Sequence, residues 1–109
     1  MGGDRTTNVQ ILTGSTTTET SESHALRGAN MMFTADGSTS AGAGAASIVI
    51  EGHCGGEVWA TIDTLSLTLG TAATVDFGST MLPWTYVRAR VASISGTGAS
   101  VNVFLGVEV

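Results

Sequence analysis

The strongest constraint on the fold is a two-residue alternation of side chains in two runs, residues 86–91 and 101–108. Successive side chains of a β-strand point to opposite faces of the sheet, so this period predicts strands with one buried face. A Ser-Gly-Thr-Gly segment at 95–98 divides the alternation and predicts a turn, with Gly98 in the left-handed conformation that glycine adopts at little cost. The apolar positions on either side of the turn are Val87, Ala89, Val91, Val101, Val103, Leu105 and Val107.

The two strands are expected to pair as one long hairpin over residues 82–109. A three-residue loop at 96–98 aligns them so that the apolar residues of both strands share one face. The cross-strand pairs in this register are Ser95–Ala99, Val91–Val103, Ala89–Leu105 and Val87–Val107. One face of the hairpin is then buried, and the opposite face carries the large polar and aromatic side chains.

That opposite face holds the candidate site of the protein. Its predicted members are Trp84, Tyr86, Arg88, Arg90 and Phe104, with Arg90 facing Phe104. Tryptophan, tyrosine, phenylalanine and arginine are enriched at protein interfaces, because each buries a large area for few fixed torsions. We therefore predict a protein interface here. The alternative is that Trp84 and Tyr86 turn into the core through a bulge, and that Arg90 only stacks on Phe104 as a surface cation–π pair.

Shorter alternations upstream predict further strands at residues 8–13, 23–27, 30–35, 46–52, 57–63, 64–69 and 74–77. The second and third of these are expected to pair around Gly28, and residues 53–56 to form the turn of another hairpin. The hydroxyl-rich tract 13–23 is expected to grade from loop into strand. Residues 37–47 contain only Gly, Ala, Ser and Thr, and this composition predicts a loop.

Eight or nine short strands without a helical period predict an all-β fold. The expected architecture is an antiparallel β-sandwich of jelly-roll or Greek-key type, and a small closed barrel is the alternative. Residues 8–109 are expected to form this single domain. The polar, glycine-containing residues 1–7 are expected to form a flexible N-terminal arm.

The charge balance narrows the possible partners. The chain of 109 residues has no lysine, four arginines and nine acidic residues, which give a net charge of −5. Nucleic-acid binding depends on clustered Lys and Arg, so a nucleic-acid partner is not expected. No apolar run approaches the roughly 18 to 20 residues of a membrane-spanning helix, so no membrane partner is expected either. The single cysteine, Cys54, excludes a framework of internal disulfides.

His53 and Cys54 are the one adjacent pair with nucleophile or metal-ligand chemistry, and Glu51 and Glu57 flank them. A zinc site needs three or four convergent ligands, and nothing in the spacing brings His24 close. A catalytic Cys–His pair needs a third group that orients the imidazole, and neighbours in sequence rarely meet that geometry. The carboxylates are scattered singly, without an acid–base pair. The sequence therefore predicts a protein that is not an enzyme and has no metal or cofactor.

The C-terminal half of the chain resembles small all-β virion proteins of tailed bacteriophages. The resemblance is carried by residues 51–52, Trp59, the Pro-Trp-Thr-Tyr-Val-Arg-Ala-Arg-Val segment 83–91, the turn 95–98 and the strand 101–106. It implies a structural component of the phage particle, located in the virion. Such proteins commonly decorate or cement a capsid, often as trimers, and others sit at the neck or tail. The acidic turn usual before the Trp strand is His-Cys-Gly-Gly-Glu here.

The partners that this resemblance implies are other copies of the chain, possibly in a trimer, and a major capsid protein or another virion protein. A second hypothesis comes from a different functional class. In a carbohydrate-binding β-sandwich module, Trp59, Trp84 or Tyr86 would serve as the platform on which a sugar ring stacks.

Overall fold

The computed structural model describes residues 6–25, 30–55, 58–81 and 84–108, and the side chains of residues 9–106 within these ranges. They form eight strands: β1 Thr6–Ser15, β2 His24–Ala25, β3 Asn30–Ser38, β4 Ala41–His53, β5 Ala60–Leu69, β6 Thr74–Thr80, β7 Tyr86–Thr97 and β8 Ser100–Glu108. The all-β prediction is confirmed. In this described part of the chain, no helix has the length and apolar character that crossing a membrane would require.

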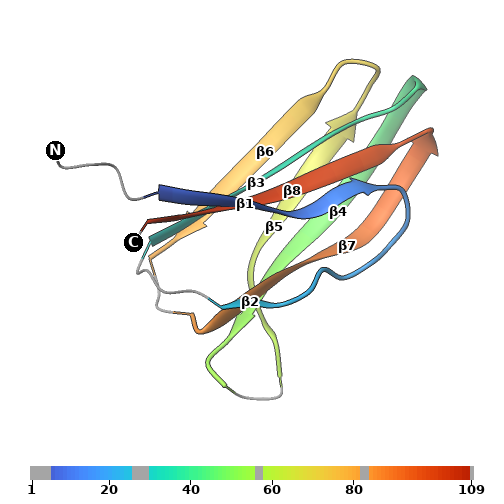
Figure 1. Ribbon diagram of the computed structural model, residues 1–109. Helices are drawn as coiled ribbons and strands as arrows, with labels where there is room; N and C mark the ends of the chain where they lie inside the picture. Colours follow the sequence, from blue (N-terminus) through green and yellow to red (C-terminus); the bar gives the residue numbers. More distant parts are fainter. Residues whose placement is uncertain (1–5, 26–29, 56–57, 82–83, 109) are drawn as a thin grey trace, which may run out of the picture.

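The strands form two antiparallel sheets that pack face to face (Figure 1). The β8 sheet has the order β1-β8-β3-β6, and the β7 sheet has the order β2-β7-β4-β5. The pairs β1–β8, β2–β7, β3–β6 and β4–β5 are those of one long antiparallel ribbon folded over itself. This is the jelly-roll arrangement. The predicted β-sandwich is confirmed, and of the two expected types the chain adopts the jelly roll.

The two C-terminal strands do not pair with each other, so the predicted hairpin over residues 82–109 is wrong. β7 lies between β2 and β4, whereas β8 lies between β1 and β3 in the opposite sheet. None of the four predicted cross-strand pairs forms. The observed pairs at the same positions are Val91–Ile48, Ala89–Ile50, Leu105–Phe33 and Val103–Ala35.

The predicted buried faces of these strands are nevertheless correct. The predicted apolar residues of both strands are 0–1% exposed: Val87, Ala89, Val91, Val101, Val103 and Leu105. Those of β7 face those of β8 across the core between the two sheets, and they are not neighbours within one sheet. The side chain of Val107 lies outside the described part. An alternation of period two predicts which face of a strand is buried, but it does not predict which strand pairs with it. Gly98 has the predicted left-handed backbone, with a φ of +62°.

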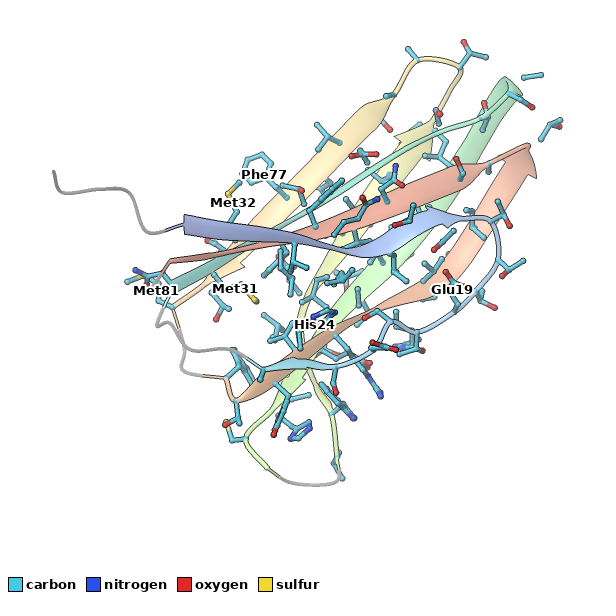
Figure 2. All side chains as sticks on the ribbon, in the orientation of Figure 1. Glu19, His24, Met31, Met32, Phe77 and Met81 are labelled. Carbon is cyan, nitrogen blue, oxygen red and sulfur yellow. The ribbon has the colours of Figure 1, made fainter. Side chains whose placement is uncertain are left out.

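The core lies between the inner faces of the two sheets. Its largest member is Phe33, which is fully buried at the centre of β3. Along the same strand, buried Met31 is followed by Met32 on the outer face (Figure 2). Burial of a side chain as large as Phe33 stabilises the fold by about 1.5–3 kcal/mol.

The Gly- and Ala-rich segment 37–47 belongs largely to strands, so the predicted loop is wrong. β3 runs to Ser38 and β4 begins at Ala41, and a short turn joins them. Small residues are needed here because the backbones approach closely: a Cβ atom on Gly44 would overlap the carbonyl oxygen of Ser95 in β7. A composition typical of a flexible loop can thus also be that of a tightly packed strand.

Two further strand predictions are corrected. Residues 57–63 and 64–69, expected as separate strands, are joined in the single strand β5, which begins at Ala60. The register of the β4–β5 pairing shifts between Ile50 and Glu51. Such a bulge interrupts the pairing locally, and β5 continues as one strand on both sides of it. The expected pair around Gly28 does not form, because β2 and β3 belong to different sheets; Gly28 itself lies outside the described residues.

The N-terminal boundary also differs from the prediction. β1 begins at Thr6, so residues 6–7 belong to a strand and not to the predicted arm. Residues 1–5 lie outside the described part of the chain.

Candidate protein-interaction surfaces

The five predicted interface residues lie in three different parts of the sandwich. Tyr86, Arg88 and Arg90 share the outer face of the β7 sheet, whereas Phe104 lies on the outer face of the β8 sheet. Trp84 precedes β7 and packs against the core, and its Nε1–H donates to Thr80 Oγ1 at 3.3 Å. The predicted single stripe and the Arg90–Phe104 contact are therefore wrong, because both depended on the hairpin. An interface role for the individual residues stays a prediction.

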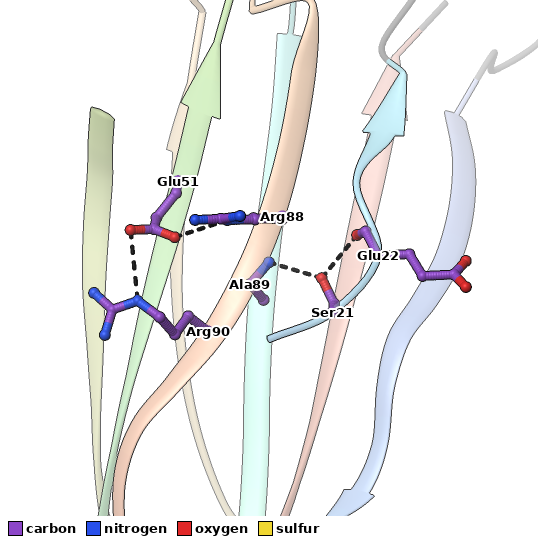
Figure 3. Close-up of polar contacts among 6 residues, drawn as sticks. All are labelled: Ser21, Glu22, Glu51, Arg88, Ala89 and Arg90. Atoms are coloured by element: carbon purple, nitrogen blue, oxygen red, sulfur yellow. Dashed lines mark hydrogen bonds and ion pairs between the residues drawn. The ribbon is translucent and has the colours of Figure 1, made fainter. Parts of the chain in front are cut away.

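Glu51 lies on the outer face of the β7 sheet, where it contacts two arginines. It stands directly opposite Arg88 in the β4–β7 ladder and is only 7% exposed. Its Oε1 accepts a hydrogen bond from Arg88 Nε at 2.9 Å, and its Oε2 lies 3.5 Å from Arg90 Nε (Figure 3). One carboxylate thus pairs with two guanidinium groups, which leaves one net positive charge in the cluster and ties β4 to β7.

An aromatic group adjoins this cluster. The Arg88 guanidinium lies 4.1 Å from the centroid of the Trp59 ring, a cation–π contact. The His53 ring makes a T-shaped contact with Trp59, with ring centroids 4.2 Å apart. The centroids of the His53 and Tyr86 rings are 5.1 Å apart. Arg88 therefore occupies one face of the indole on which a sugar would stack. Trp84 packs against the core, and Tyr86, which is 37% exposed, contacts the ring of His53.

The His53–Cys54 pair lies in the turn after β4. The His53 Nδ1 atom accepts a hydrogen bond from the Gly55 N–H at 2.9 Å, and Cys54 is exposed. This geometry gives His53 a role in closing the turn. Across the described ranges, no group of three His, Cys, Asp or Glu side chains converges as metal ligands. Glu57, the second predicted flanking carboxylate, lies outside those ranges.

The outer face of the β8 sheet carries exposed apolar side chains from β3, from β6 and from the residue that follows β6. We call Met32, Val75, Phe77 and Met81 the apolar patch; their exposed fractions are 47%, 64%, 64% and 77%. Met32 and Phe77 project from neighbouring strands on the same side (Figure 2). Large apolar groups gathered on one face of a soluble protein typically mark a contact surface.

An open groove of about 740 Å³ lies beside this patch. Met32, Met81 and Phe104 supply its outward apolar side chains, and none of its lining residues is charged. Gly106 stands opposite Met32 in the β3–β8 ladder, so a position with no side chain separates Met32 from β1. Methionine side chains are flexible and polarisable, and they suit a surface that adapts to an apolar partner.

The sequence pattern does not reveal this patch, because the apolar residues of β6 face outward. Val75 and Phe77 point outward, while Asp76 and Gly78 face the interior. Local contacts explain why these two residues face inward. The Asp76 carboxylate accepts a hydrogen bond from the Ser66 N–H at 3.1 Å. At position 78 only glycine fits, because a Cβ atom there would collide with Phe33. The alternation of Val75 and Phe77 was visible in the sequence, but its direction was not.

The chain was compared with known proteins. No protein-family model and no curated protein matches it. Among solved structures, it is similar to the SPBc2 prophage-derived protein YomS, with 16% sequence identity, a TM-score of 0.59, and coverage of 98% of this chain and 96% of YomS. It is also similar to the PBSX exported protein XepA, with 13% identity, a TM-score of 0.52 and coverage of 98% of this chain and 37% of XepA. These likenesses establish a shared fold.

Proposed function

We propose that this protein is a non-enzymatic structural component of a bacteriophage particle, and most specifically a capsid decoration (cement) protein that binds the head shell. Jelly rolls occur in viral capsid proteins and in lectins, so the fold by itself does not select a function. The proposal is supported by the sequence resemblance to phage virion proteins and by the fold shared with a prophage-derived protein.

The observation that carries the proposal is the apolar patch with its groove. Exposed large apolar side chains are costly to leave in water, and a partner protein that covers them gains about 25 cal/mol for each Å² of apolar surface removed from water. The uncharged lining of the groove favours an apolar segment of that partner over a charged one. Phe104 is the one predicted interface residue that belongs to this surface.

The test uses particles of the encoding phage assembled without this protein. Purified wild-type protein is expected to sediment with the particles, and the double variant Met32→Ser and Phe77→Ser is expected to bind at least about tenfold more weakly, because the centre of the contact loses its apolar area. The matched control is Val58→Ser, since Val58 is apolar and 83% exposed but belongs neither to the apolar patch nor to the groove. Wild-type binding by a folded double variant would overturn the docking surface.

Electron microscopy of decorated particles separates the head from the other virion positions. Density over the head shell supports the decoration role, whereas density only at the neck or tail supports an accessory role there. A carbohydrate-binding role predicts a change in tryptophan fluorescence with soluble glycans, and the contact of Arg88 with Trp59 leads us to expect none.

A further inference from the structure

A two-sheet sandwich has four edge strands, here β1 and β6 of the β8 sheet and β2 and β5 of the β7 sheet. An edge strand exposes backbone N–H and C=O groups that can pair with another chain, and proteins usually protect such edges. The β5 and β6 edges are linked by the hydrogen bond from the Ser66 N–H to the Asp76 carboxylate. Both strands also carry an acidic residue, which disfavours the approach of a further strand.

The β2 edge is protected in another way. β2 has only two residues, and the chain before it runs along β7. There the Ser21 N–H donates to the Ala89 carbonyl oxygen, and the Val91 N–H donates to the Glu19 carbonyl oxygen, both at 2.8 Å. An incoming strand therefore finds these β7 groups already paired.

β1 has no such protection in its first half. Its ten residues, Thr6–Ser15, include no charged residue and no proline. Register shifts distort the strand beyond Gln10, and Gly14 has a φ of +56°, but residues 6–10 pair regularly with β8. Since β1 ends the β8 sheet, the other edge of this regular segment faces away from every described strand of that sheet. Thr and Val also have high β propensity.

Val9 is an apolar side chain that this edge leaves partly exposed. It stands opposite Leu105, so it lies on the core side of the sheet. Leu105 is 1% exposed, yet Val9 is 38% exposed because it lies in the outermost strand. A strand added next to β1 would cover this side chain and extend the core by one residue.

We propose that residues 6–10 of β1 form a strand-addition site and that its occupant is the same segment of a second copy, antiparallel about a two-fold axis at Asn8. Each copy carries a net charge of −5, so two copies repel each other except where they meet through uncharged surface. The β1 segment is such a surface. In this register Thr7 of one copy stands opposite Val9 of the other.

The two-fold axis runs perpendicular to the sheet, so the outer faces of both β8 sheets point the same way. The two apolar patches then lie on the same side of one continuous sheet, one toward each end, and they provide two equivalent contacts. This consequence rests on the proposed function, because it predicts that a dimer binds a particle through both copies and gains avidity. The pairing itself does not depend on that function.

Sedimentation equilibrium of the full chain tests the pairing. Five residues from each strand make a small contact, so the wild type is expected to associate into dimers that dissociate on dilution. Asn8→Asp and Asn8→Lys each place two like charges face to face across the axis, and each is expected to reduce dimer formation at least about tenfold. An equal mixture of the two variants should restore the dimer, because opposite charges then meet.

Two controls keep the outcomes distinct. Val58→Lys adds a charge away from β1 and should leave dimerisation unchanged, and the Met32→Ser and Phe77→Ser variant should still dimerise even though it binds particles weakly. A wild-type protein that stays monomeric up to about 1 mM, the range of the weakest specific contacts, would overturn the pairing. The same holds if folded Asn8 variants associate as the wild type does, or if their mixture fails to form dimers.

Discussion

The Nε atom of Arg88 lies 2.9 Å from Oε1 of Glu51, directly across the β4–β7 ladder. The same guanidinium covers the ring of Trp59, and the same carboxylate receives Arg90. Four side chains from β4, β7 and the segment before β5 thus stabilise one another on the outer face of a sheet. Because Glu51 is 7% exposed, these partners replace the water contacts that its carboxylate loses.

Removal of the Glu51 charge should destabilise the fold. Glu51→Gln is expected to lower the free energy of unfolding by about 1.5–3 kcal/mol, the usual contribution of hydrogen bonds to charged groups. Urea denaturation measures the change. Glu22→Gln is the control, because the Glu22 side chain is exposed, and it should change stability by less than about 0.5 kcal/mol. Equal effects of the two substitutions would contradict a structural role for Glu51.

The two arginines should contribute unequally. Arg88→Met loses both the hydrogen bond and the cation–π contact, which together should amount to about 2 kcal/mol or more. Arg90 lies farther from the carboxylate, at 3.5 Å, and its side chain is 41% exposed, so Arg90→Met should cost less than about 1 kcal/mol. Thermal unfolding of both variants at low and high salt tests this order, and a larger loss for Arg90→Met would refute it.

Replacement of Gly44 by a residue with a side chain should lower the free energy of unfolding. Gly44→Ala places a Cβ atom against the Ser95 carbonyl oxygen, so β4 and β7 must separate locally, at a cost of about 1–3 kcal/mol. Gly70→Ala is the matched control, since a Cβ atom there meets nothing within 4 Å. Urea midpoints of the two variants provide the comparison. A tolerated alanine at position 44 would show that the segment is not the close-packed strand described here.

Truncation of two phenylalanines on neighbouring strands should change the stability by very different amounts. Phe33 is fully buried and Phe77 is 64% exposed. Phe33→Ala should cost about 3–5 kcal/mol because it leaves a cavity in the core. Phe77→Ala should stay within about 0.5–1 kcal/mol of the wild type. Calorimetric unfolding measures both, and a large loss for Phe77→Ala would mean that β6 buries the face taken here as exposed.

Much of the fold was predictable from local pattern. The burial of Val87, Ala89, Val91 and Leu105 follows from a period of two, and the left-handed Gly98 follows from the turn chemistry of glycine. Both depend only on neighbouring residues. The segment 37–47 was misjudged because composition does not distinguish a flexible loop from a strand in which small residues permit close packing.

The candidate site was less predictable, because its members come from separate strands. Arg88 and Arg90 were identified from the sequence, but their partner Glu51 was weighed only as a neighbour of His53 and Cys54. Nothing in the sequence pairs β4 with β7. The apolar patch was missed because the direction of the β6 alternation depends on Phe33, which fills the space beside Gly78.

The sequence by itself determined which side of each long strand is apolar, where the last turn lies and that the chain is all β, because each property is set by residues within a few positions of one another. The tertiary structure decided which strands are neighbours and which outer face stays apolar. A hairpin and a two-layer sandwich bury the same side chains of β7 and β8. The choice between them depends on whether β8 pairs with β3 and β7 pairs with β4, and those pairs join residues about 30 to 80 positions apart.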